Sequence, residues 1–349
     1  MRTIVAEPQD LVLRVHARGV VVPAVEIDLV PEVAGRVVRL SPSFVNGGFF
    51  RRGEVLVEID SRDYRLAVEA ARAEVAAAEV RLAKEQAEAD VARREWERLH
   101  AGRKPPPLVV HAPQLAEARA ALEAARARLE RAKLDLERTR LLAPFDGRVR
   151  QEHIDVGQYV RPGTAVGRIY SVEAAEVRLP LPLSELAYLE LPLPRRDQSS
   201  RAEPQVVLSA EVGGRRYTWH GRIVRTEGEI DAKTRMIHAV ARVEDPYAAG
   251  GDPERPPLAV GMFVEAEILG RRVEGVFAVP PLAMRGPETA MVVDREGKLR
   301  LRKVEVLRHE PNRVLITGGL SRGERLCVSP LDVVTDGMPV RIAGQEGEP

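Results

Sequence analysis

The middle of the chain carries the hydrophobic repeat of a coiled coil. Between residues 61 and 140 the sequence is dominated by Ala, Arg, Glu and Leu, with one interruption at 102–113. Apolar residues recur at alternating spacings of three and four residues on both sides of the interruption. They occupy sixteen of the seventeen positions counted in this way, and Glu85 is the exception. A repeat of about 3.5 residues predicts two helices that pack along a narrow seam. The larger seam residues are Val68, Val75, Leu82, Trp96, Leu115, Leu122, Leu129 and Leu136.

The interruption separates the two predicted helices. Three consecutive prolines at 105–107 prevent a continuous helix, because they remove backbone donors and clash with the preceding turn. We therefore predict one antiparallel helical hairpin over residues 61–140, with its tip at 100–113. The alternative is two helices of a compact bundle. The narrow apolar stripe of each helix, with charged residues on its other faces, favours the hairpin.

An internal repeat brackets the hairpin. The segment around Gly35 and Gly53 returns around Gly147 and Gly163, with glycine spacings of 18 and 16 residues. Each copy is too short to bury a core by itself, so the two copies together predict one small β-sandwich with the hairpin inserted in its middle. We expect all four glycines to occupy tight turns that need a positive φ.

The rest of the chain is predicted to be β-structure. Residues 173–345 hold short Val-rich runs separated by Gly, Pro and Asp, which is typical of strands and turns. The fold class is therefore mainly β with a long α-helical coiled-coil hairpin. A length of 349 residues exceeds one ordinary domain, and a composition of 44% apolar and 30% charged residues excludes disorder.

Charge and hydropathy narrow the function classes. The net charge of +1 gives no general attraction to nucleic acid, and only 4% of the residues are aromatic, so base-stacking platforms are not expected. No run reaches the roughly 18 apolar residues of a membrane span. The start turns polar after six residues, so it lacks the apolar region of a signal peptide. If the protein works outside the cytoplasm, we expect its targeting or anchoring segment to be missing from this chain.

Candidate chemistry is sparse. The single cysteine, Cys327, excludes an intrachain disulfide and a cysteine zinc site. His100 and His111 could meet across the hairpin turn, but two ligands do not make a zinc site, and we expect both to be solvated tip residues. Ser184 lacks a nucleophile elbow around it and is predicted to be a helix N-cap. We predict no catalytic residue, no metal site and no cofactor.

Several motifs resemble one known family. Residues 31–37 with 53–60, and 138–147 with 156–163, resemble the two halves of a biotinyl/lipoyl-type sandwich split by a helical hairpin. The Ala-Pro-Phe-Asp-Gly string at 143–147 is among the most specific of these motifs. Such split sandwiches occur in periplasmic adaptor proteins, also called membrane fusion proteins. Further motifs of that family are similar to residues 230–235, 260–264, 279–283, 318–324 and 336–340.

The resemblance implies four nested modules. A covalent lipoyl carrier is the alternative for the sandwich, but it would need a modifiable Lys at the junction now occupied by the hairpin. The implied segments are an N-terminal strand (1–29) that joins the β-barrel and the membrane-proximal domain, lipoyl-like halves (30–60 and 141–172), the hairpin (61–140), the β-barrel (173–274) and the membrane-proximal β domain (275–349).

The resemblance also implies a function. A non-catalytic periplasmic adaptor would link an inner-membrane pump of the resistance-nodulation-division (RND) type to an outer-membrane channel, for multidrug or toxic-compound efflux. It would associate with the inner membrane and form a hexameric ring or a dimer of trimers. Two alternatives stay open: an adaptor of an ABC-type or type I exporter, and a cytoplasmic coiled-coil scaffold.

The resemblance places partner binding at the hairpin tip. The tip departs from the family pattern, because no Ser occurs between Leu99 and Gln114. The resemblance therefore implies only where docking occurs, at the hairpin tip, and not which residues perform it. An apolar contact patch and a simple cap on the coiled coil are the two interpretations. The candidate docking residues are Arg98, Leu99, His100, Leu108, Val109 and Val110.

Overall fold

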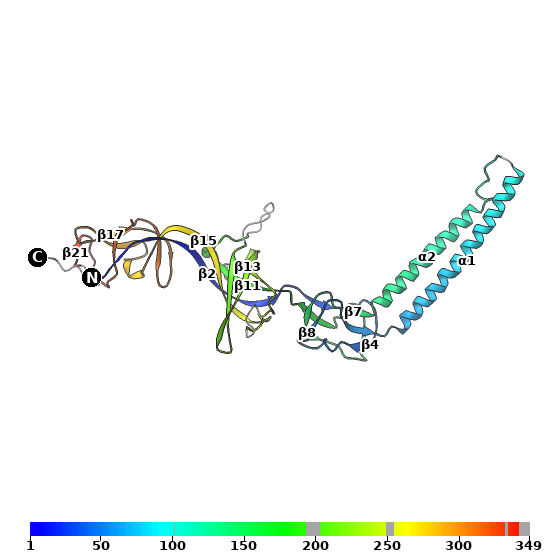
Figure 1. Ribbon diagram of the computed structural model, residues 1–349, viewed down its shortest axis with the longest axis horizontal. Helices are drawn as coiled ribbons and strands as arrows, with labels where there is room; N and C mark the ends of the chain where they lie inside the picture. The colour runs from blue at the N-terminus through cyan, green and yellow to red at the C-terminus, as the bar shows by residue number, and fades with distance from the viewer. Residues whose placement is uncertain (101, 193–202, 249–254, 332–333, 342–349) are drawn as a thin grey trace. The chain divides into compact units, whose positions relative to one another are not determined.

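A computed structural model describes residues 1–100, 102–192, 203–248, 255–331 and 334–341. It confirms the mainly β fold class, to which two long helices are added (Figure 1). The chain divides into two compact units. One unit holds residues 1–21, 177–243 and 261–349, and the other holds residues 22–176 and 244–260.

The second unit contains a β-sandwich of two four-stranded sheets. Each sheet takes strands from both copies of the repeat, and the strands pair antiparallel. Fifteen buried apolar residues form one core, eight from residues 29–59 and seven from residues 141–169. Neither copy closes this core alone. One sheet is β3 (Glu26–Leu29), β10 (Gly167–Ser171), β8 (Gly147–Glu152) and β5 (Phe49–Phe50), and the other is β7 (Arg140–Leu142), β6 (Val55–Ile59), β4 (Gly35–Leu40) and β9 (Tyr159–Val160).

Two helices are inserted between the halves of the sandwich. Helix α1 spans Arg62–Leu99 and α2 spans Ala112–Glu137. At the base, the Tyr64 hydroxyl donates a 2.7 Å hydrogen bond to the Ala34 carbonyl, which ties α1 to the sandwich. The predicted interruption ended at residue 113, but helix α2 begins at Ala112, so the predicted interruption is two residues too long. Pro113 is tolerated there because the amide that it lacks has no acceptor in a first helical turn.

The first unit contains a closed β-barrel. Its six strands run in the order β12–β13–β14–β11–β2–β15, and β12 pairs again with β15 to close it. Trp219 is among its largest fully buried side chains. Residues Leu183–Tyr188 form a short 3-10 helix, η1, capped by Pro182, so the predicted N-cap at Ser184 is wrong. The bounds are β2 (Pro8–Pro23), β11 (Ala174–Pro182), β12 (Gln205–Val212), β13 (Arg215–Ile230), β14 (Met236–Glu244) and β15 (Phe263–Val279).

The same unit ends in a smaller β domain in which residue 1 lies beside residue 341, the last described residue. The Met1 amino group donates a 2.6 Å hydrogen bond to the Arg341 carbonyl, and β1 pairs with β20. Two strands, β18 (Glu305–His309) and β19 (Val314–Gly318), extend the barrel sheet beside the end of β15. The five-stranded sheet is β1 (Thr3–Val5), β20 (Arg325–Cys327), β16 (Thr289–Val293), β17 (Lys298–Lys303) and β21 (Met338–Pro339), with a 3-10 turn η2 (Pro281–Ala283) before it.

Helices α1 and α2 are long but rich in charge. Among the described residues, no helix has an apolar stretch long enough to cross a membrane.

Candidate functional site

The two helices pack along the alternating seam. Three residues on each helix are buried: Val68, Ala71 and Ala89 on α1, and Ala118, Leu122 and Ala125 on α2. The other large seam residues, Val75, Leu82, Trp96, Leu115, Leu129 and Leu136, are half-buried. Leu134 lies off the seam and is 49% exposed. Burial therefore follows the seam, and the remaining faces of both helices are free to carry charge.

Ion pairs across the seam establish the direction of the helices. Arg81 contacts Glu117, and Arg128 contacts Glu74, each at 2.7 Å. Residue numbers that increase along α2 are therefore paired with residue numbers that decrease along α1, as an antiparallel pair of helices requires. These side chains are more than half exposed, so each pair adds at most about 1 kcal/mol to stability.

An aromatic pair ends helix α1. The Trp96 and His100 rings stack with centroids 3.9 Å apart, and the Trp96 indole donates a 3.2 Å hydrogen bond to the Arg103 carbonyl. His100 is half-buried, and its Nδ1 atom has no hydrogen-bond partner among the described residues. The prediction that His100 is solvated is therefore wrong, because the indole covers one face of its ring.

A tight turn leads from the prolines into helix α2. The Pro106 carbonyl accepts hydrogen bonds from the amides of Val109 and Val110, at 3.0 and 3.4 Å. His111 then adopts a left-handed backbone with φ of 54° and stands as the N-cap of α2. This turn folds the His111 side chain back toward α1.

The predicted docking residues fall into two groups. Leu99 and Leu108 are 70% and 75% exposed, and Arg98 and Val109 are also exposed. Val110 and His100 are half-buried. The apolar tip therefore presents two leucines outward, whereas Val110 packs inward and serves the turn.

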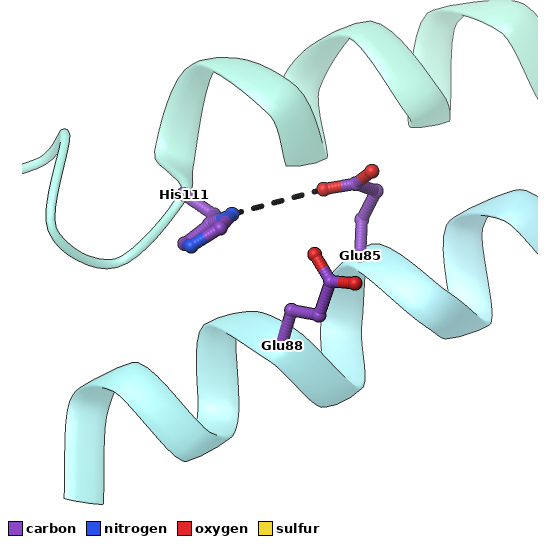
Figure 2. Close-up of side chains that lie close together, drawn as sticks. All are labelled: Glu85, Glu88 and His111. Carbon is purple, nitrogen blue, oxygen red and sulfur yellow. Dashed lines mark ion pairs between the residues drawn. The ribbon is translucent and has the colours of Figure 1, made fainter. Parts of the chain in front are cut away.

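A polar cluster lies just below the tip, where α2 begins (Figure 2). Glu85 and Glu88 project from one face of α1 toward His111, and the His111 Nδ1 atom is 3.8 Å from a Glu85 carboxylate oxygen. Glu85 is the polar position in the predicted seam, and the His111 side chain beside it is 34% exposed, so solvent reaches this imidazole as expected. The two predicted tip histidines do not form a pair, since His100 stacks on Trp96 while His111 faces the glutamates.

A surface hollow of about 400 Å³ adjoins this cluster. Its lining includes Glu88, Glu95 and His111 together with Val91 and two alanines. Solvent and small solutes can therefore reach the cluster from one side.

The glycines of the repeat divide into two kinds. Gly53 and Gly163 lie in turns with φ of 80° and 87°. The turn assignment is wrong for Gly35 and Gly147, which begin strands β4 and β8. A Cβ atom at Gly147 would lie 2.3 Å from the Tyr170 carbonyl oxygen, and one at Gly35 would lie 2.5 Å from the Ile59 side chain. Close packing excludes a side chain at both positions.

An aromatic cluster in the second unit was not predicted. The Arg148 guanidinium lies 4.4 Å from the Phe49 ring centroid and donates a 2.8 Å hydrogen bond to the Gly47 carbonyl. Tyr247 meets Phe49 edge to face at 5.7 Å and lies 3.3 Å, hydroxyl to hydroxyl, from Tyr170. Burial, aided by the Tyr247 hydroxyl, raises the pKa of Tyr170 to about 12. This cluster fastens residues 244–248 onto the sandwich.

The barrel also has a hollow, of about 830 Å³, which includes Arg18, Arg216 and Glu265 in its lining. Both arginines pair with Glu265, Arg18 at 3.0 Å. Their charges are thus partly matched within the lining, and we assign no ligand to this hollow.

Two segments of the chain match known domain families. Residues 26–171 match the CzcB-like barrel-sandwich hybrid domain, which covers the sandwich and its inserted hairpin. Residues 282–333 match the C-terminal permuted SH3 domain of RND membrane fusion proteins. These matches, with the relatives below, confirm the predicted resemblance to periplasmic adaptor proteins, or membrane fusion proteins.

Relatives with similar sequences are efflux proteins. The chain is 24% identical over 315 residues to the multidrug resistance protein MdtA of Pantoea ananatis, covering 88% of this chain and 72% of that protein. It is 27% identical over 317 residues to the solvent efflux pump periplasmic linker SrpA of Pseudomonas putida, covering 89% of this chain and 76% of that protein.

Solved structures share the fold. A MacA–MexA chimera containing the Pseudomonas aeruginosa MexA α-hairpin domain has a TM-score of 0.62 at 19% identity, covering 93% of this chain and 98% of the chimera. MacA from Actinobacillus actinomycetemcomitans also has a TM-score of 0.62, at 17% identity, covering 94% and 99%.

Proposed function

We propose that this protein is a non-catalytic periplasmic adaptor that links an inner-membrane RND-type transporter to an outer-membrane channel. The observation that carries the proposal is the pair of matches: a hairpin-bearing sandwich, and a C-terminal domain of the RND membrane fusion type. The RND description of the second match favours this pump class over an ABC-type exporter. The exported compounds are drugs or other toxic small molecules, as the names of the relatives suggest.

The four modules have separate tasks in this proposal. The membrane-proximal domain (275–349) and the barrel (173–274) meet the pump, and the N-terminal strand (1–29) joins them. The two lipoyl-like halves (30–60 and 141–172) carry the hairpin (61–140), whose tip meets the channel. Six copies, arranged as a ring or as a dimer of trimers, enclose a duct. The protein works in the periplasm and associates with the inner membrane.

The hairpin suits channel docking for a physical reason. Its stability depends on the seam, so outward residues such as Leu99 and Leu108 do not hold the helices together. Two large apolar side chains exposed near the proline turn can bind a complementary surface. The adaptor loses little conformational entropy on binding, because the prolines already restrict the unbound turn.

A complementation experiment tests this docking role. In a strain that lacks the gene, the Leu99→Asp/Leu108→Asp variant should leave the cells as sensitive to exported compounds as the empty vector does. Leu66→Asp/Val80→Asp is a matched control, because Leu66 and Val80 are 68% and 71% exposed on the same hairpin, away from its tip. The unmodified gene and the control should both restore tolerance.

The outcomes separate the alternatives. Equal tolerance for the tip variant and the control would reject docking through the two leucines. No change in sensitivity upon deletion, across a broad panel of compounds, would reject the efflux role. Cell fractionation tests the scaffold alternative, which predicts the protein in the cytoplasm. Cross-linking in cells should capture an RND-type transporter, and capture of an ATP-driven exporter would favour the ABC alternative.

A further inference from the structure

The seam of the hairpin contains one ionisable interruption, at Glu85. Its side chain is 21% exposed, between the half-buried Leu82 and the buried Ala89 on α1. An apolar residue at this position would continue the packing, whereas a carboxylate needs a compensating positive charge. Within the described residues, Glu85 forms an ion pair with His111, and the 3.8 Å between the two atoms is longer than a hydrogen bond. No Lys or Arg side chain among the described residues pairs with Glu85.

Three groups that can coordinate a metal meet at this position from two separate segments (Figure 2). Glu85 and Glu88 are three residues apart and share one face of α1, while His111 comes from the turn before α2. One ligand atom from each residue lies within 4.8 Å of the other two. The set is mixed, with two carboxylates and one imidazole, and is not simply a group of surface acids.

We propose that Glu85, Glu88 and His111 bind a divalent first-row transition-metal ion of the zinc class. Zinc takes imidazole nitrogen and carboxylate oxygen at about 2.0–2.2 Å, so tetrahedral ligand atoms stand roughly 3.4 Å apart. The candidate ligand atoms lie within 4.8 Å of one another, so coordination at this spacing would require the two glutamate side chains to rotate toward the ion. Water takes the fourth position from the adjoining hollow. This site goes beyond the adaptor role and does not depend on it.

The ligand set selects among cations. Calcium and magnesium take mainly oxygen ligands, with six or more around the ion, whereas imidazole suits zinc, copper and nickel. Lys84 is the competing positive charge, with its amino group 3.8 Å from Glu88. Its side chain is 73% exposed, so the ion can displace it from Glu88 without breaking any packing.

A bound ion would connect the two arms at the point where the chain returns from the tip. His111 is the last residue of the proline turn and the N-cap of α2, so fixing its ring to α1 also restrains residues 102–110. Metal binding would thereby order the segment that carries Leu108 without contacting it.

A metal titration tests the site on the full chain, without a histidine tag and after treatment with a chelator. Zinc added against a coloured competing chelator should bind at one ion per chain, and cobalt should give visible absorption bands typical of mixed nitrogen and oxygen ligands. Glu85→Gln, Glu88→Gln and His111→Asn should each weaken zinc binding by at least about tenfold. Zinc should also slow amide hydrogen exchange in residues 102–115.

Two controls match the variants in charge and residue type. Glu97→Gln removes one negative charge from an exposed position of α1, and His100→Asn removes the other tip imidazole. Both should bind zinc as the unmodified chain does. Glu88 is 45% exposed, so its Gln variant should keep the helical circular dichroism even if the other two variants unfold. Absence of saturable zinc binding, equal binding by Glu88→Gln, or calcium binding as tight as zinc binding would each overturn the proposal.

Discussion

The sandwich and the hairpin bury their apolar residues in opposite ways. The sandwich gathers fifteen buried apolar residues from two segments separated by the whole hairpin. The hairpin has three buried residues on each helix, and they repeat along one line. The sandwich closes one core around contacts between distant segments, whereas the hairpin repeats one kind of contact along two helices.

This difference determines how each region responds to change. A residue in the sandwich core touches strands from both copies, so its loss weakens the whole module. A residue on the outer face of the hairpin touches little, so partner-binding side chains can occupy that face without destabilising the fold. The hairpin is thus the region where surface chemistry can change while the architecture is kept.

The largest expected effect is in the sandwich core. Phe44→Ala removes a fully buried ring that packs against Gly167, and should destabilise the sandwich by about 3–5 kcal/mol. Hydrogen exchange of peptides from β4 and β8, followed by mass spectrometry, measures this loss. Phe49→Ala is the matched control, since Phe49 is 55% exposed, and it should cost much less. Equal losses for the two phenylalanines would contradict the assigned core.

A smaller loss is expected in the hairpin seam. Leu122→Asp places a charge at a seam position that is 5% exposed, and should cost about 2–3 kcal/mol, because the helix pair is thin enough for water to reach the carboxylate. Helical circular dichroism during thermal melting measures the effect. Leu134→Asp, at a position 49% exposed on the same helix, should melt almost as the unmodified chain does. Identical melting of both variants would refute the seam.

The smallest effect concerns acid stability of the sandwich. Arg39 donates hydrogen bonds of 2.7 and 3.0 Å to Glu58 and thereby lowers the pKa of that carboxyl group. Because the pKa is lower in the folded state, the stabilisation is complete above the ordinary Glu value of about 4.3 and is lost as the pH falls through the folded pKa. Glu58→Gln should therefore flatten the acid-side decline of the melting temperature between about pH 6 and pH 3.

The partner residue provides a cross-check on this pH effect. Arg39→Gln should flatten the acid-side decline in the same way, because the pair requires both side chains. A decline as steep in both variants as in the unmodified chain would show that the pair does not contribute.

The hairpin was predictable because its signal is local. A 3.5-residue repeat indicates a seam wherever it occurs, and the residues of that repeat are buried or half-buried in the structure except Leu99, the last one on α1. The pairing of the two repeat copies was predictable for a related reason: neither copy is long enough to enclose a core.

The roles of Gly35 and Gly147 could not be predicted from the sequence. Gly53 and Gly163 adopt a positive φ, which neighbouring turn residues in the sequence indicate. Gly35 and Gly147 are instead required because Ile59 and Tyr170 leave no room for a side chain. Only the sheet pairing brings those neighbours into place. Tyr247 was missed for the same reason, since it reaches Phe49 and Tyr170 from a distant segment.

The sequence by itself determined the periodic elements, the repeat around the hairpin and the resemblance to membrane fusion proteins, because these depend on spacing between near neighbours. The tertiary structure alone decided which polar groups converge. Glu85 stood out in the sequence as the exception in the seam, but His111 joins it only because the proline turn folds the chain back with a left-handed residue. Distances between ligand atoms depend on that turn, and a turn of this kind leaves no periodic pattern along the chain.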